Sequence, residues 1–203
     1  MSECTLQVIG ALKDISLAVA GIVTACVAIA GLKNWNRELK GKAQFEVARN
    51  LIRATYDLRD KLNMARSPAI FSNEYPSEYS HFDQDPKVQA SAEEFVYQAR
   101  MKPVLSSLRE YQTSALEAEA LWGKDIKEKC TAFESCIGMF RNAVSSYIKN
   151  TASRGEYFNG REALQKTTEE RLWDSLDESN EFTKEINRKI SDLENLTRPH
   201  LAK

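Results

Sequence analysis

The sequence predicts an all-α protein in which an N-terminal transmembrane helix continues into an antiparallel four-helix bundle. Three observations support this fold class. Residues 15–32 contain no charged side chain, and the long segments after them place apolar residues three or four positions apart. The alternation of apolar and polar residues that half-buried strands require is absent. The 203 residues are 42% hydrophobic and 28% charged, which is typical of a globular chain.

Residues 15–32 have the length and composition of a membrane span. As a helix they extend about 27 Å, just enough for a hydrocarbon core of about 30 Å. Aromatic and basic side chains are common where a span meets the membrane surface. The sequence therefore predicts a transmembrane helix over 15–32, followed by five membrane-interface anchors: Lys33, Trp35, Arg37, Lys40 and Lys42.

Two other interpretations of this run are weaker. The stretch Ala28–Gly31 matches the small-residue pattern of an export-signal cleavage site. Such signals begin with a basic region, whereas this chain begins with Glu3, Lys13 and Asp14. A buried helix of a soluble protein is also disfavoured, because every face of the run is apolar.

The charge distribution predicts the orientation. Cations follow the span, so we expect the C-terminal side to be cytoplasmic and residues 1–14 to form a short extracytoplasmic N-terminus. Cys130 and Cys136 show neither zinc-ligand spacing nor a disulfide framework, which favours reduced thiols in a cytosolic domain. The chain is thus predicted to be a single-pass protein of the cell membrane.

Small residues within the span predict self-association. They form two neighbouring rows made of Ala20, Gly21, Thr24, Ala25 and Ala28. Small side chains let two helix backbones approach closely, and this contact drives association in lipid. The hydroxyl of Thr24 has two possible uses: it could line a pore, or it could bond the backbone carbonyl one turn back. We expect a homo-oligomer.

The segments behind the span are predicted to form the bundle. Residues 33–66 combine the junction with the first bundle helix, which no breaker separates from the span and which ends before Pro68. Residues 67–89 form a Pro-rich loop. Residues 90–203 supply the remaining helices, expected over 90–122 with a kink near Pro103, over 124–150, and over 161–196 with a stop at Pro199.

The sequence argues against catalysis and metal binding. A ferritin-like site needs two Glu-x-x-His elements, and only Glu78 with His81 matches, inside the Pro-rich loop. His81, Asp83 and Asp85 could form a weak cation cluster, although an exposed acidic loop is far commoner. Glycine loops that bind phosphate are also absent. We therefore expect no catalytic, cofactor-binding or metal-ligating residue and no enzymatic activity.

The first bundle helix carries a possible polar network made of Glu46, Arg49, Arg53 and Asp57. Arg53 and Asp57 are four residues apart, which suits an ion pair on a helix. Two interpretations stay open: a solvated face of weak pairs, or an inter-helix or inter-subunit network that could also bind an anion. No Lys/Arg cluster outside 33–42 resembles a nucleic-acid site, so we expect no nucleic-acid partner.

Two motifs carry a resemblance. The junction Trp35–Lys42 reads W-x-x-E-L-K-G-K, and Glu117–Gly123 reads E-A-x-x-L-W-G. With the short N-terminal span, these resemble a group of uncharacterised bacterial single-span inner-membrane proteins with a cytoplasmic helical domain. The resemblance implies a bacterial inner-membrane location and no particular activity.

These observations favour a membrane-anchored interaction or scaffold module. The expected partners are the lipid bilayer, further copies of the chain and a cytoplasmic protein that the bundle senses or binds. One alternative is a membrane effector, for example in phage defence, whose oligomerised spans perturb the bilayer. Another is a metal-binding or enzymatic bundle that uses the loop at 67–89.

Overall fold

The computed structural model describes residues 3–80, 82, 84–174 and 179–201, with side chains from Ser16 onward except that of Ala18. The chain divides into two compact units, residues 1–45 and 46–203. The described residues form five α-helices and two short 3-10 helices, and they contain no strand. The predicted all-α class is confirmed.

The first helix, α1, runs without interruption from Glu3 to Ala65. It ends where the amides of Arg66 and Ser67 bond the carbonyls of Leu62 and Met64, at 3.0 and 3.2 Å. Pro68 disfavours the helical conformation for the residue before it, which explains the position of this end. The continuous helix expected across the junction is therefore present.

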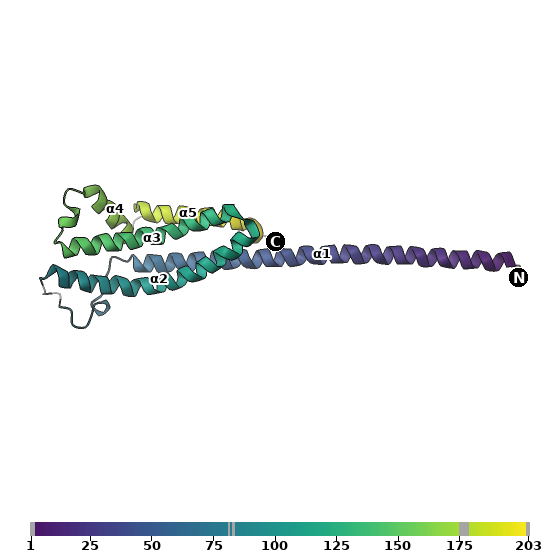
Figure 1. The fold of residues 1–203 in the computed structure, drawn as a ribbon, viewed down its shortest axis with the longest axis horizontal. Coiled ribbons are helices and arrows are strands. Elements are labelled where there is room, and N and C mark those ends of the chain that lie inside the picture. Colours follow the sequence, from purple (N-terminus) through teal and green to yellow (C-terminus); the bar gives the residue numbers. More distant parts are fainter. Residues whose placement is uncertain (1–2, 81, 83, 175–178, 202–203) are drawn as a thin grey trace. The chain divides into compact units, whose positions relative to one another are not determined.

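In the second unit, α1 contributes one face to the core. Leu51, Leu58 and Leu62 are fully buried and are seven and four residues apart, spacings that place side chains on one face of a helix. The helices α2 (Pro86–Trp122) and α3 (Lys124–Ala152) form an antiparallel hairpin beside it (Figure 1). Only Gly123 joins them, with φ of 77° and ψ of −146°, a conformation that side chains with a Cβ rarely adopt.

The helix α2 begins four residues earlier than expected. Pro86 occupies the first turn, where its missing N–H costs nothing, and the Asp85 carboxylate accepts the Lys87 amide at 2.9 Å. The helix continues through Pro103. A short 3-10 helix, η1 (Ser72–Glu74), lies in the Pro-rich segment before it.

The prediction of one helix over 161–196 is wrong. After η2 (Glu156–Phe158), the chain forms α4 (Glu162–Leu172) and then α5 (Glu181–Leu201). Trp173 is extended, with φ of −114° and ψ of 136°, so α4 ends there. The expected stop at Pro199 is also wrong, because α5 continues to Leu201.

The core of the second unit lies between α1, α2, α3 and α5. The helix α3 buries Ile126, Cys130, Phe133, Cys136, Ile137, Phe140 and Ala143, and α5 buries Phe182, Ile186, Ile190 and Leu193. Tyr111 of α2 packs edge-to-face on Phe133 at 5.4 Å, and its hydroxyl donates to the Cys130 carbonyl at 3.0 Å. The four long segments thus share one core, and α4 adds a shorter helix against α3.

Candidate functional site

The apolar part of α1 exposes its side chains on every face. Ile22, Val27, Ile29 and Leu32 are 63–68% exposed. The most apolar window of eighteen residues has a mean hydropathy of 1.2 and no buried residue, so α1 is long and apolar enough to cross a membrane. No other described residue of the chain buries this surface.

The predicted self-association residues all lie on this exposed surface: Ala20, Gly21, Thr24, Ala25 and Ala28. A Cβ added to Gly21 would meet nothing within 4 Å, so no contact inside the chain requires a glycine there. The Thr24 hydroxyl donates to the Ala20 carbonyl at 2.8 Å, which is the local bond considered for this side chain.

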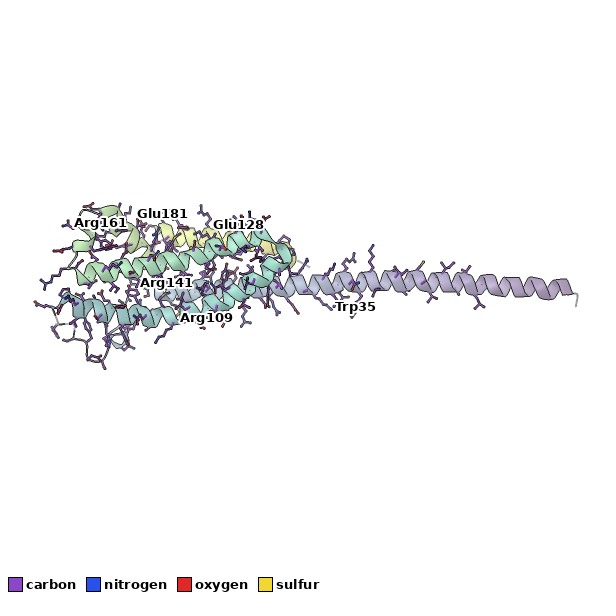
Figure 2. The ribbon with its side chains drawn as sticks, in the orientation of Figure 1. Trp35, Arg109, Glu128, Arg141, Arg161 and Glu181 are labelled. Carbon is purple, nitrogen blue, oxygen red and sulfur yellow. The ribbon has the colours of Figure 1, made fainter. Side chains whose placement is uncertain are left out.

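The predicted interface anchors are also exposed. Trp35 is 57% exposed, and Figure 2 shows it projecting from α1. Arg37 donates to the Asn34 amide oxygen at 3.2 Å, and Lys42 pairs with Glu38 at 2.8 Å. Lys33 and Lys40 are exposed as well. These long cationic side chains are therefore accessible to a membrane surface or to water.

A groove separates α1 from α2 in the second unit. Its volume is about 490 Å³, and its lining is mostly polar: Asn50, Arg53, Ala54, Asp57, Glu110 and Ser114. At its edge, Ser107 donates to the Asp57 carboxylate at 2.6 Å. The groove thus presents one cation and two carboxylates on a surface built by two antiparallel helices.

Only two of the four residues of the predicted polar network line this groove. Arg53 and Asp57 line it, whereas Glu46 and Arg49 are exposed on α1. Within the described residues, no ion pair joins Arg53 to Asp57, and the Asp57 carboxylate accepts from Ser107 on the neighbouring helix. The four side chains therefore form no closed network among themselves.

A buried arginine ties the end of α1 to the segment between α4 and α5. Arg66 is fully buried, and its guanidinium donates to the carbonyls of Glu170, Arg171 and Trp173 at 2.9–3.2 Å. It also bonds the Thr183 hydroxyl at 2.9 Å. Because the last carbonyls of a helix lack intrahelical partners, the guanidinium satisfies the C-terminal end of α4.

Further contacts surround this guanidinium. The Asp174 carboxylate lies 3.7 Å from it, the Asn180 side-chain oxygen accepts at 3.3 Å, and the Phe182 ring lies 4.9 Å away. Burial lowers the pKa of Arg66, and the charge of Asp174 opposes that shift. A charge removed from water is stable only with such partners, so the cluster has a structural role.

A second buried charge lies between α2 and α3. Glu93 is 5% exposed, and its carboxylate accepts from the hydroxyls of Tyr147 and Thr151 at 3.1 and 2.9 Å. Tyr147 packs against Tyr97 and Trp173, and burial raises the pKa of Tyr97 to about 12. The carboxylate is thus held by two hydroxyl donors beside a cluster of aromatic rings.

The Pro-rich segment is attached to α2 by one arginine. Arg100 pairs with both carboxylate oxygens of Glu74, at 2.6 and 2.8 Å, and donates to the carbonyls of Ser67 and Ala69. The hydrogen bonds from Arg100 are the main cause that lowers the pKa of Glu74. This part of the loop is therefore fixed to the bundle by a partly buried salt bridge.

Of the cation cluster considered for the loop, His81 and Asp83 lie outside the described residues. Asp85, its third member, caps α2. Among the described residues, no group of three or more His, Cys, Asp or Glu side chains could hold a metal ion. His200 stacks on Trp122 at 4.4 Å.

Sequence reasoning missed Arg66 and Glu93. Both stand at positions that the apolar periodicity would turn toward the core, and this is the only signal in the sequence. Their partners lie far away along the chain: Thr183 for Arg66, and Tyr147 for Glu93. Such pairing depends on the tertiary register of the helices and cannot be read from spacing alone.

Comparison with protein-family models, with curated proteins and with solved structures finds no match to this chain. The functional argument therefore rests on the chain's own residues.

Proposed function

We propose that the protein is a membrane-anchored helical interaction module that self-associates and binds a protein partner through its cytoplasmic bundle. The main supporting observation is the exposed apolar surface of α1, where Ile22, Val27 and Ile29 are 65–68% exposed. In water, such a surface would have a large free-energy cost, whereas lipid tails cover it without further protein.

The placement proposed for the chain follows from its charges. Basic residues follow the span, which supports a cytoplasmic bundle and an extracytoplasmic N-terminus in a bacterial inner membrane. The buried, free Cys130 and Cys136 are compatible with a reducing compartment, and burial raises the pKa of both thiols. Unreactive thiols of this kind support a structural role for both residues.

The interaction role is supported by the chemistry of the bundle. Its buried charges, Arg66 and Glu93, are engaged by hydrogen bonds within the fold. The groove between α1 and α2 is open at the surface, unlike an enclosed pocket that would exclude water from a reaction. A surface of this kind suits binding better than catalysis, and we propose no enzymatic activity.

Self-association in the membrane is tested by co-capture of two differently tagged full-length chains from nanodiscs. Gly21→Leu and Ala25→Leu each place a large side chain on the small-residue face, and we expect co-capture to fall about tenfold or more. Val23→Leu is the matched control, because residues two apart point to different sides of a helix. Equal co-capture by Gly21→Leu and Val23→Leu would show that the small-residue face makes no contact.

A dye-leakage assay on cells separates this function from the effector alternative. An anchor leaves the membrane intact when the chain is overproduced. Leakage that disappears with Gly21→Leu would instead support an effector whose assembled spans perturb the bilayer.

A further inference from the structure

The groove between α1 and α2 places opposite charges at the same height on two antiparallel helices. The register is set by the bond of 2.6 Å between Ser107 and Asp57. About one turn from that bond, Arg53 of α1 and Glu110 of α2 both line the groove. A cation and an anion thus face outward at one level along the bundle.

These two side chains lack partners in the part of the chain that the structure describes. Neither Arg53 nor Glu110 makes an ion pair or a side-chain hydrogen bond there. Farther toward the end of α2, Arg49 and Glu117 repeat the arrangement with a second exposed cation on α1 and a second exposed anion on α2. On α1 the two cations lie on one side of Asp57, whose carboxylate accepts the hydrogen bond from Ser107. On α2 the two anions lie at about the matching levels.

Large apolar side chains flank this charged centre. Met64 lies eleven residues after Arg53, and Leu121 lies eleven residues after Glu110. Eleven residues are about three helical turns, so each apolar residue shares the face of its charged counterpart. Met64 is 69% exposed and Leu121 is 44% exposed. Exposed apolar side chains that flank a complementary charge pattern are a common property of protein interfaces.

We propose that this surface, formed by α1 and α2 around the groove, binds the same surface of a second copy about a two-fold axis parallel to the helices. Such an axis sets α1 of one copy against α2 of the other. A rotation about it leaves the position of each residue along the helix direction unchanged. Arg53 then meets Glu110 of the second copy, and the reciprocal pair forms at the same level. Arg49 and Glu117 pair in the same way. The inference depends on the proposed self-association and adds a second contact to it, located in the bundle.

Charge reversal tests the pairing in the full-length chain in nanodiscs, again with two tags. Arg53→Glu sets like charges against each other at both symmetry-related positions, and so does Glu110→Arg. We expect either change alone to raise the dissociation constant on the order of tenfold. Arg109→Glu is the matched control, because Arg109 (Figure 2) neighbours Glu110 in sequence but does not line the groove.

A mixture of the two single variants distinguishes pairing between chains from pairing within one chain. At positions 53 and 110, a chain with Arg53→Glu carries two anions, and a chain with Glu110→Arg carries two cations. Across a mixed dimer, both pairs are therefore complementary, and we expect near wild-type affinity and selective formation of the mixed species. Within each variant chain, residues 53 and 110 still carry like charges. If Arg53 and Glu110 paired only within one chain, mixing the variants would therefore not restore the affinity.

The outcomes are separable. Wild-type affinity in both single variants, or no recovery on mixing, overturns the proposed surface. If the charge variants keep wild-type affinity while Gly21→Leu loses association, the span alone mediates self-association. A wild-type chain that is monomeric under all conditions overturns both this inference and the self-association on which it depends.

Discussion

The two parts of α1 use apolar residues in different ways. From Leu17 to Leu39, large apolar side chains are exposed around the helix, at 48–68%. From Ala48 to Ala65, one face is buried, with Leu51, Leu58 and Leu62 at 0% exposure, while Arg53 and Asp60 on the other face are exposed. The first pattern suits a helix surrounded by lipid, and the second suits a helix with one protein-facing side.

Whether a part of α1 packs into the core therefore depends more on the spacing of its apolar residues than on their number. The uniformly apolar segment contributes no buried side chains to the core of the bundle. The periodic segment contributes one apolar face to that core. Substitutions in the two parts of α1 should therefore differ strongly in their effect on the folding of the bundle.

The largest effect is expected at the end of α1, where the bundle buries a charge. Arg66→Met removes the guanidinium that bonds the carbonyls of Glu170, Arg171 and Trp173, so buried acceptors lose their donor. We expect the free energy of unfolding to fall by about 3–5 kcal/mol. Chemical denaturation in detergent, with tryptophan fluorescence as the readout, measures this free energy of unfolding. Arg59→Met is the control, because Arg59 pairs with Asp60 at the surface; equal losses in both variants would contradict this role.

A matched pair of leucines tests the comparison directly. Leu58→Ala leaves a cavity in the core, and we expect a loss of about 3 kcal/mol in the free energy of unfolding. Leu32 is 63% exposed, so Leu32→Ala should leave the unfolding of the bundle unchanged. The same denaturation experiment measures both. A similar loss in both variants would show that the two parts of α1 do not differ in this respect.

The salt bridge of the Pro-rich segment gives a smaller, pH-dependent effect. The pKa of Glu74 lies below its ordinary value of 4.5, chiefly because of hydrogen bonds from Arg100. A lowered pKa of a carboxyl group stabilises the fold above that ordinary value, and the contribution disappears as the pH falls through the pKa of the folded state. We expect Glu74→Gln to cost about 1–2 kcal/mol at pH 7.

Denaturation between pH 3 and pH 7 checks the sign of this effect. The difference between the wild type and Glu74→Gln should shrink below about pH 4.5. Glu78→Gln serves as the control, because Glu78 is exposed and, among the described residues, accepts a side-chain hydrogen bond only from its neighbour Ser77. A difference that stays constant down to pH 3 would contradict the assignment.

The smallest effect is expected for one buried hydroxyl. Tyr111→Phe removes the hydrogen bond to the Cys130 carbonyl and keeps the ring packed on Phe133. Since the ring fills the same space, we expect a loss of only about 1 kcal/mol, measured by denaturation. A loss as large as that of Leu58→Ala would mean that the hydroxyl supports more than this single bond.

Helices and their core-facing residues could be predicted because they depend on neighbours three or four positions away. The stripe of α3, from Ile126 to Phe140, is buried as its spacing predicts. The break between α4 and α5 could not be predicted in this way. Trp173 adopts an extended conformation whose carbonyl accepts from Arg66, more than a hundred residues earlier.

In the candidate surfaces, too, only the features that depend on nearby residues could be predicted from the sequence. Spacing alone placed Arg53 and Asp57 on one face of α1, and both line the groove. The other wall, with Glu110 and Ser114, depends on how α2 packs beside α1, which the sequence does not specify locally. The use of the groove and of the span as contact surfaces remains a prediction.

The central claim is that residues 15–32 cross a membrane. Carbonate extraction of cell membranes that contain the full-length chain tests it most directly, with Ile22→Lys and Val23→Lys combined as the comparison variant. We predict that the wild-type chain stays in the membrane pellet and that the two lysines move a large share of the chain into the supernatant, because a charge at the centre of a span costs about 3 kcal/mol. A wild-type chain that is released into the supernatant would contradict the account.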